Sequence, residues 1–258
     1  MSPSRALRPF AFFFFALLAT EFTHAEEYSY KASLTQTHPL AADGEITFVN
    51  TNGNVTIRTW DRNEVRIEAE KSAKTREELD LIEISIEPGP HRLGIKTKLP
   101  KRGSGWFNHQ TIRAQVTFTL TVPATVRLSA IETVNGSISL EGTRGPIHAR
   151  SVNGRIRGRG LAADAEFATV NGGIDAEFAL VVADQKISTR TVNGSATITL
   201  PPDASLTFSG RCVNGDVRCD FPLKIQQHRR NRLSGTIGAG AASLEAESVN
   251  GGIHVKQL

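Results

Sequence analysis

The chain of 258 residues is poor in cysteine, methionine and tryptophan, and it contains no apolar run of 18 residues. Two cysteines exclude a disulfide-stapled scaffold and a zinc site built from four cysteines. Without a long apolar run, no segment is expected to span a membrane as a helix. The net charge of +4 is too small to indicate a nucleic-acid partner, and a hydrophobic content of 39% excludes a disordered chain.

The first 25 residues carry the pattern of a secretory signal peptide. Arg5 and Arg8 precede an 11-residue apolar run at 10–20, and small residues at Thr23 and Ala25 suit a cleavage site. The apolar run is too short to cross the roughly 30 Å hydrocarbon core of a bilayer. We therefore expect an exported protein of the periplasm, the cell surface or the medium. After cleavage behind Ala25 it should have no transmembrane segment.

One short string, a small residue followed by Val-Asn-Gly, recurs six times in the second half of the chain. Its asparagines are 18, 18, 22, 21 and 36 residues apart. A degenerate copy at 232–235 divides the longest interval into 20 and 16, which gives seven units with a period near 20. The Asn-Gly pairs of the six clear copies are Asn135, Gly136, Asn153, Gly154, Asn171, Gly172, Asn193, Gly194, Asn214, Gly215, Asn250 and Gly251.

Aligned on the asparagine, the repeats show columns that alternate between apolar and polar residues. The third residue after the asparagine is apolar in every copy, from Ile138 to Ile253. The fourth residue after it is mixed, with Arg157 and Asp175 in successive copies. This alternation predicts short β-strands that bury one face and expose the other.

The Asn-Gly pairs could close two-residue hairpins, or they could form corners between strands that stack on the next repeat. A hairpin would place Val152 opposite Arg155, an apolar residue against a charged one, on one face of a sheet. The pattern therefore favours corners of an all-β solenoid, or β-helix, with coils of about 18–22 residues and apolar residues inward on both sides of the corner. We expect the glycine to supply a positive φ. The asparagines should form one ladder, and the Thr or Ser residues two places earlier a second.

The spacing does not fix the handedness of the coil, and we expect the right-handed form. Residues 26–127 are less regular, but Asn52-Gly53 gives another corner, so coils should begin near Gly44. Strands are expected over 82–86, 93–98 and 112–122, and a single helical turn over 75–80. The chain thus divides into a signal peptide (1–25), an N-terminal cap or extension (26–43) and a β-solenoid domain (44–258).

The strand at 46–49, its Asn-Gly corner and the Trp60-Asp61 pair resemble the opening of the bacterial "putative adhesin" β-strand-repeat family, whose function is unknown. The turn at Val122-Pro123 and the Thr-Val-Asn-Gly coils that follow it are also similar to that family. The resemblance covers roughly residues 40–258. It implies a β-solenoid and an adhesin-like role, and it brings no catalytic residues.

No catalytic constellation stands out. The six histidines after the signal peptide lack metal-ligand spacing, and neither a Gly-x-Ser-x-Gly motif nor a phosphate-binding loop is present. Arg157 beside Asp175 in the next coil is typical of a solvated charge pair rather than of a paired acid and base. We predict no catalytic, cofactor or metal residue, and we expect a protein that is not an enzyme. Cys212 and Cys219 could form a disulfide or remain two buried thiols.

Two irregular segments concentrate positive charge. One carries Lys101, Arg102 and Trp106 in a glycine-rich stretch, and the other carries Arg229, Arg230 and Arg232. The first could simply pack on the solenoid and the second could be a solvated loop. The alternative for both is contact with an anionic surface such as lipopolysaccharide, phospholipid headgroups or acidic polysaccharide.

Three functions remain open from the sequence. The leading hypothesis is a non-enzymatic adhesin-like binding or scaffold module at the cell envelope, whose ligand is polysaccharide or anionic lipid rather than nucleic acid. The second is a carbohydrate-active enzyme of the β-helix type acting on acidic polysaccharide, for which a groove with two or more carboxylates within about 10 Å would be the sign. The third is a structural protein that associates with itself.

Overall fold

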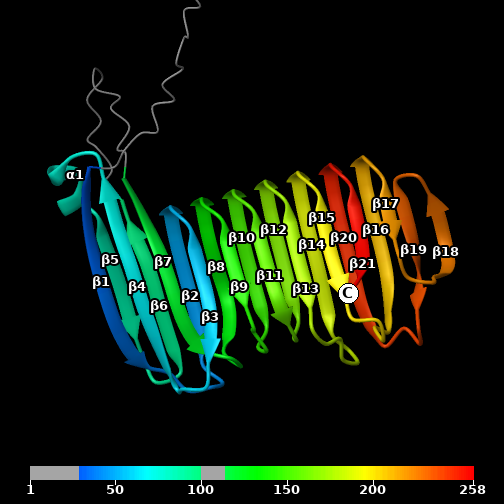
Figure 1. Ribbon diagram of the computed structural model, residues 1–258, viewed down its shortest axis with the longest axis horizontal. Helices are drawn as coiled ribbons and strands as arrows, with labels where there is room; N and C mark the ends of the chain where they lie inside the picture. The colour runs from blue at the N-terminus through cyan, green and yellow to red at the C-terminus, as the bar shows by residue number, and fades with distance from the viewer. Residues whose placement is uncertain (1–28, 100–113) are drawn as a thin grey trace, which may run out of the picture.

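The computed structural model describes residues 29–99 and 114–258, which form an all-β solenoid flattened into two sheets (Figure 1). Each coil gives one strand to a ten-stranded sheet and one to an eleven-stranded sheet, and the apolar core lies between the sheets. The predicted signal peptide and Lys101, Arg102 and Trp106 lie outside the described residues. The parts that are described contain no helix with the length and apolarity to cross a membrane.

Strands far apart in the sequence are neighbours in both sheets. The ten-stranded sheet contains, in spatial order, β1 (Tyr30–Pro39), β4 (Glu64–Ala73), β7 (Ala114–Pro123), β3 (Val55–Trp60), β9 (Ile138–Glu141), β11 (Ile156–Leu161), β13 (Ile174–Phe178), β15 (Ala196–Leu200), β21 (Ile253–Gln257) and β17 (Val217–Cys219). The eleven-stranded sheet contains β18 (Lys224–Arg229), β19 (Arg232–Ile237), β16 (Leu206–Asn214), β20 (Ala242–Asn250), β14 (Lys186–Asn193), β12 (Ala165–Asn171), β10 (Ile147–Asn153), β8 (Arg127–Asn135), β2 (Glu45–Asn52), β6 (Arg92–Lys98) and β5 (Glu83–Pro88).

The strands and the helical turn expected in the irregular N-terminal part are confirmed to within a few residues. The short helix α1 (Arg76–Asp80) begins after Thr75, whose side chain accepts a hydrogen bond from the backbone N–H of Glu78. The strand β1, inside the segment expected to be a cap or extension, pairs antiparallel with β4 and forms the edge of the ten-stranded sheet.

Two of the apolar columns read from the repeat face the core as expected. The third residue after each asparagine is buried in all six copies, and so is the sixth residue before it in the later copies. In-register parallel pairing stacks each column on its counterpart, as in the pairing of Ile156 with Ile138 and with Ile174. The inner face of the solenoid is therefore a set of apolar stacks that run along its length, and burial of these stacks is the main stabilising contribution.

The corner asparagines form one continuous ladder of hydrogen bonds. Each carboxamide nitrogen donates to the carboxamide oxygen of the asparagine in the neighbouring coil over 2.7–2.9 Å. At the N-terminal end the nitrogen of Asn52 donates instead to the carbonyl oxygen of Ala114. The predicted asparagine ladder is therefore confirmed, and it includes the corner of the less regular first coil. In spatial order its members are Asn52, Asn135, Asn153, Asn171, Asn193, Asn250 and Asn214.

The corner glycines are required by close approach rather than by a positive φ at every coil. A Cβ on Gly154 would lie 1.9 Å from the carbonyl oxygen of Gly136, and one on Gly172 would lie 2.1 Å from that of Gly154. Gly136, Gly154, Gly172 and Gly194 are absent from the positive-φ residues of the chain, so the expectation of a positive φ is wrong for these four corners. The physical reason is stacking, because each corner backbone packs directly on the next with no room for a side chain.

The hydroxyl column forms a ladder of a different kind from the one expected. Ser151, Thr169 and Thr191 are buried, and each donates to the carbonyl oxygen of the corner glycine in the preceding coil over 2.9 Å. Since successive residues of a strand point to opposite faces, an inward hydroxyl turns the following valine outward. Apolar residues therefore do not point inward at this position, and that expectation is wrong for the valine column. Its exposed members are Val134, Val152, Val170, Val213 and Val249.

The last coil of the sequence is not the last coil in space. The red strands β20 and β21 lie between the β14–β15 coil and the β16–β17 coil (Figure 1). The degenerate copy at 232–235 is not a coil, because β19 runs antiparallel to β16 and pairs with β18 in a terminal hairpin. The expectation of seven coils that follow the order of the sequence is therefore wrong. The coil made by β16 and β17 therefore forms the end of the solenoid, and the later strands β20 and β21, the returning coil, lie between it and the coil made by β14 and β15.

Two neighbouring glycines test the close-approach account. We expect Gly172→Ala to destabilise the protein by about 3 kcal/mol or more, since its Cβ would overlap a backbone carbonyl that cannot move without its own coil. Gly173→Ala is the control, because its Cβ would have 3.3 Å to the nearest atom, and it should cost no more than about 1 kcal/mol. Urea unfolding measures both variants, and equal losses of stability would contradict the account.

The returning coil predicts an unusual response to truncation. Removal of residues 241–258 deletes β20 and β21 and leaves β14 and β16 separated by an unfilled place. We expect the truncated chain to lose cooperative unfolding, measured by circular dichroism during a thermal scan. Removal of residues 1–39 deletes only the edge strand β1 among the described strands and should leave a cooperative transition. A cooperative transition in the C-terminal truncation would show that the coil is peripheral.

Candidate functional site

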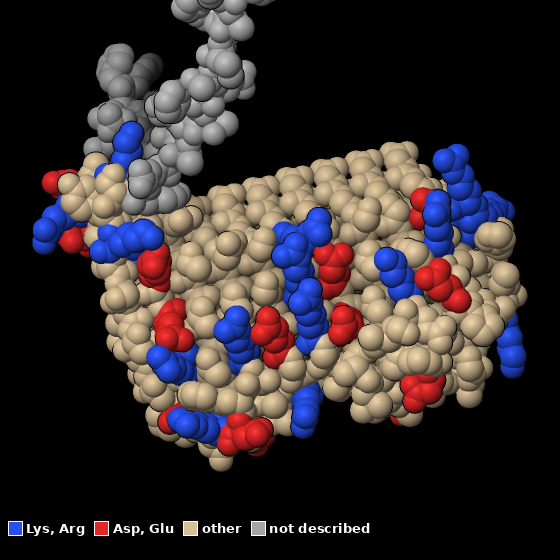
Figure 2. Space-filling model, viewed as in Figure 1, with Lys and Arg blue, Asp and Glu red and all other residues tan. Residues whose placement is uncertain are grey.

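Charged side chains on the outer faces of the solenoid mostly stand in pairs of opposite sign. On the face in Figure 2, blue and red groups alternate across the strands, while the upper edge, where the Asn-Gly corners lie, carries none. Typical contacts of the ten-stranded sheet are Arg58 with Glu141 at 3.3 Å and Arg155 with Asp175 at 3.1 Å. Such exposed pairs contribute little stability, and they leave little net charge on these faces.

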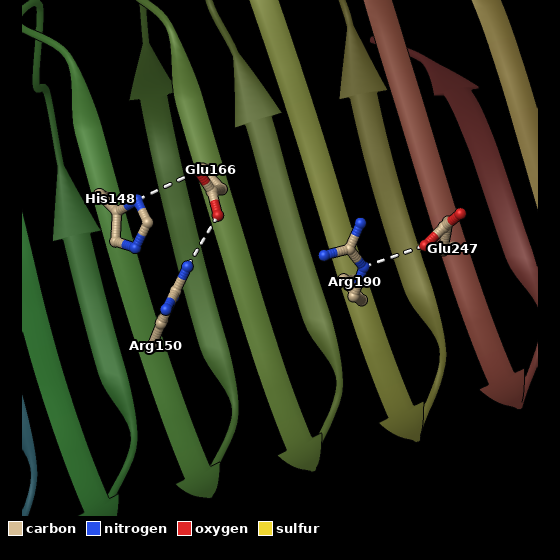
Figure 3. A network of polar contacts seen from close by, with 5 residues as sticks. All are labelled: His148, Arg150, Glu166, Arg190 and Glu247. Carbon is tan, nitrogen blue, oxygen red and sulfur yellow. Dashed lines mark hydrogen bonds and ion pairs between the residues drawn. The ribbon is translucent and has the colours of Figure 1, made fainter.

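The outer face of the eleven-stranded sheet carries a denser network (Figure 3). Glu166 on β12 accepts from both His148 and Arg150 on β10, each over 3.1 Å, and Arg190 on β14 donates to Glu247 on β20 over 2.9 Å. Partial burial is the largest influence on the pKa of Glu166 and raises it. The hydrogen bonds and positive charges of Arg150 and His148 together outweigh burial and lower that pKa below its ordinary value of 4.5.

A groove of about 500 Å³ lies beside this network. Its floor includes Ala168, which lies between Arg150 and Arg190 on the two flanking strands and has only a methyl side chain. Its rim includes the exposed valines of three coils, Val134, Val152 and Val170. Both arginines already contact carboxylates, whereas Glu132, which also lines the groove, forms no ion pair among the described residues, so the groove offers an apolar rim and one unpaired carboxylate.

The C-terminal end of the solenoid differs from its faces, because positive charges stand side by side there. Arg232 on β19 lies directly opposite Arg211 on β16, and on its other side directly opposite Arg229 on β18. We call Arg211, Arg229 and Arg232 the arginine row. Neighbouring strands lie roughly 5 Å apart, so three like charges in register on adjacent strands repel one another and destabilise the sheet.

Two carboxylates, those of Glu245 and Glu247, lie beside the arginine row, but neither forms an ion pair with it. Among the described residues none of its three arginines takes part in an ion pair, and Glu247, which lies opposite Arg211, contacts Arg190 instead. Arg230 adds a fourth positive charge at the turn of the hairpin, and Figure 2 shows blue groups gathered at this end. A cleft of about 240 Å³ lies between Arg211 and Arg232, and its lining includes Ser209 and Gln227 together with the carboxylates of Glu245 and Glu247.

The chemistry of this end suits an anion. Arginine presents a planar fork of N–H donors that matches the oxygens of phosphate and carboxylate groups, and Ser209 and Gln227 add neutral donors beside the fork. The described residues contain no group of three His, Cys, Asp or Glu side chains that could hold a metal ion.

The structure brings together three of the six residues predicted to contact an anionic surface. Arg229, Arg230 and Arg232 lie at one hairpin, whereas Lys101, Arg102 and Trp106 lie outside the described residues. Sequence reasoning missed Arg211, because the parallel register of a degenerate repeat at 232–235 aligns Arg232 with Cys212 rather than with Arg211. The opposing arginines become visible only when 232–237 is recognised as an antiparallel strand. Cys212 and Cys219 are both free thiols, the first buried and the second partly exposed.

A groove with two carboxylates close together, the feature expected of a polysaccharide-degrading enzyme, is also present on the ten-stranded sheet. Asp175 and Glu177 project from the same face of β13, about 7 Å apart along the strand, into an open groove of about 490 Å³. Arg155 contacts Asp175 at 3.1 Å and Arg157 contacts it at 4.0 Å, while Thr197 and Thr199 line the other side.

Comparisons with known proteins give one family match and several distant likenesses to solved structures. The sequence model of the family described as Toastrack DUF4097 matches residues 124–256. A search of curated proteins finds no match. A structure described as a putative cell adhesion protein from Clostridium sporogenes is 15% identical, covers 88% of this chain and 100% of its own, and has a TM-score of 0.49. A putative adhesin from Bacteroides fragilis is 11% identical, covers 88% of this chain and 97% of its own, and has a TM-score of 0.31.

The network around Glu166 predicts a pH-dependent contribution to stability. Because the folded-state pKa is lower than the unfolded value, the contribution is present above about pH 4.5 and is lost as the pH falls through the folded-state pKa. Since the side chain is almost half exposed, the contribution should not exceed about 1 kcal/mol. We expect Glu166→Gln to unfold in less urea than the wild type at pH 7, with the difference vanishing on acidification. Glu245→Gln, in the same column of β20, controls for the loss of a negative charge, and a difference that grows on acidification would contradict the assignment.

Proposed function

The chain belongs to the Toastrack DUF4097 family, and from that premise we propose that it is a non-enzymatic, exported, adhesin-like module that binds an anionic ligand at the cell envelope. The ligand chemistry is a repeated phosphate or carboxylate group, as on an anionic lipid surface or an acidic polysaccharide. Export rests on the sequence pattern of residues 1–25, which lie outside the described residues.

The arginine row carries this proposal. Three guanidinium groups in register on β16, β19 and β18 repel one another in the free protein. Along the described faces of the solenoid, the ion pairs of the arginines join them to carboxylates of the same or a nearby coil, as for Arg150 and Arg190. An anionic ligand would remove the repulsion at the end of the solenoid and gain charge-assisted hydrogen bonds there.

The position of the row suits an extended ligand or a surface. It lies at one end of an elongated molecule, on the last strands of the eleven-stranded sheet (Figure 1). A membrane or a polymer can approach that end without meeting the alternating charges of the long faces. Attraction between exposed charges is screened by salt, so the affinity should fall as the ionic strength rises.

Charge reversal tests the proposal. We expect Arg229→Glu/Arg232→Glu to reduce binding at least about tenfold, a loss of about 1.4 kcal/mol, because two attractive charges become repulsive. The probes are phosphatidylcholine vesicles with and without phosphatidylglycerol, in a sedimentation assay, and immobilised polygalacturonate. The lipid and polymer arms distinguish the two sources of the anion.

The matched control carries the same change of net charge elsewhere. Arg155→Glu/Arg157→Glu reverses two arginines that already contact Asp175 on a long face, and it should leave binding within about twofold, the scatter expected of a distant site. The proposal would be overturned if the wild type and the row variant bound both probes with equal affinity. It would also be overturned if the affinity did not change with ionic strength.

A polysaccharide-degrading enzyme is the second candidate, favoured by the two carboxylates on β13. The groove beside Asp175 and Glu177 would have to hold the sugar chain, with one carboxyl acting as acid and the other as base or nucleophile. A depolymerisation assay on polygalacturonate with the wild type and with Asp175→Asn/Glu177→Gln decides between them. If the wild type depolymerises polygalacturonate and the double variant does not, the protein is an enzyme rather than a binding module.

A further inference from the structure

Seven corners of the solenoid share one dipeptide, asparagine followed by glycine, and six of them share Val-Asn-Gly. In this dipeptide the backbone nitrogen of the glycine can attack the side-chain carbonyl carbon of the asparagine, because glycine has no side chain to obstruct the ring that forms. The seven corners therefore have nearly the same intrinsic reactivity, and any difference among them must come from the fold.

The ladder holds six of the seven carboxamides at both ends. In each of these six, the nitrogen donates to one neighbour and the oxygen accepts from the other, as Asn153 does between Asn135 and Asn171. Attack on the carbonyl carbon requires the carboxamide to leave the plane of the ladder, which breaks both bonds. Exposure does not distinguish the corners, since Asn135, Asn153, Asn171, Asn193, Asn214 and Asn250 are all exposed.

Asn214 is the exception because it stands at the end of the ladder. Its nitrogen donates to Asn250 over 2.9 Å, but no described residue donates to its oxygen. The backbone N–H of Gly215 likewise has no acceptor among the described residues, whereas those of Gly194 and Gly251 donate to the carbonyl oxygens of Asn250 and Asn214 in the adjacent coils. The N–H of Gly154 also lacks a described acceptor, but the oxygen of Asn153 accepts from Asn171, so Asn214-Gly215 alone among the described corners leaves both the nucleophile and the electrophile without these bonds.

We propose that Asn214 is a site of spontaneous deamidation in the folded protein. The nitrogen of Gly215 loses its proton and forms a bond to the Cγ of Asn214, the bond from Cγ to the side-chain nitrogen breaks, and ammonia leaves with the protons it needs. Water then opens the cyclic imide at one of its two carbonyls and gives aspartate or isoaspartate at position 214.

The product changes both the ladder and its surroundings. A carboxylate cannot donate to the oxygen of Asn250, so the end coil loses the bond that joins it to the ladder. The hairpin turn lies against this corner, because the carbonyl oxygens of Arg230 and Asn231 accept from the backbone of Val217 and Cys212. The new negative charge therefore appears beside Arg230, where it weakens attraction for an anion. This last consequence rests on the proposed function, whereas the reaction itself does not.

Peptide mapping by mass spectrometry tests the inference with six internal controls. The purified full chain is kept at mildly alkaline pH and 37 °C, and the conversion of each Asn-Gly pair is followed over time. We expect Asn214 to convert at least about tenfold faster than any of the other six, which corresponds to about 1.4 kcal/mol for the ladder bond that those six must additionally break.

A second sample in urea removes the fold. There all seven sites should convert at similar rates, since only their shared dipeptide remains. Equal rates in the folded protein, or an interior asparagine that converts faster than Asn214, would overturn the inference. Conversion is read from the mass of the peptide, so it is independent of whether the arginine row binds a ligand.

Discussion

The stacking of one Asn-Gly corner directly on the next is the constraint on which the rest of the solenoid depends. Corner backbones approach so closely that a Cβ on Gly172 would lie 2.1 Å from the carbonyl oxygen of Gly154. This contact fixes the register between coils at one edge, and the asparagine ladder joins the same edge by side-chain hydrogen bonds of 2.7–2.9 Å. Once the register is fixed, apolar columns meet in the core and charged columns meet on the outside.

The same register explains why the surface is mostly neutral and where it is not. Parallel pairing aligns whole columns, so a carboxylate in one coil lies beside an arginine in the next, as for Glu166 and Arg150. The pattern ends where the chain turns back on itself. The antiparallel strand β19 brings Arg232 opposite Arg211, and the positive charge is left without an internal partner among the described residues. The proposed ligand site is thus a consequence of how the solenoid is closed.

The periodicity of the sequence revealed the coils, because the columns of the aligned repeats can be recognised from the sequence alone. It placed Ile138 and Ile253 in the core, predicted the asparagine ladder and located the first corner at Asn52-Gly53. It could not reveal the returning coil, since coils related by one repeat are interchangeable in sequence and only packing decides that β20 lies between β14 and β16. The arginine row was hidden for a different reason, because its members become neighbours only when 232–237 pairs antiparallel with β16 and β18. The valine column was misplaced because its apolar character was given more weight than the alternation of side chains between the two faces of a strand.

Side-chain hydrogen exchange of the asparagines, followed by nuclear magnetic resonance, tests the central claim most directly. The chain contains its own references in Asn63 and Asn231, which are exposed and whose carboxamides make no hydrogen bond to other described residues. The account predicts that the carboxamide protons of Asn135, Asn153, Asn171 and Asn193 exchange much more slowly than those of the two references, although these asparagines are exposed as well. Carboxamide protons that exchange at the same rate in both groups would show that the ladder does not hold the corners together.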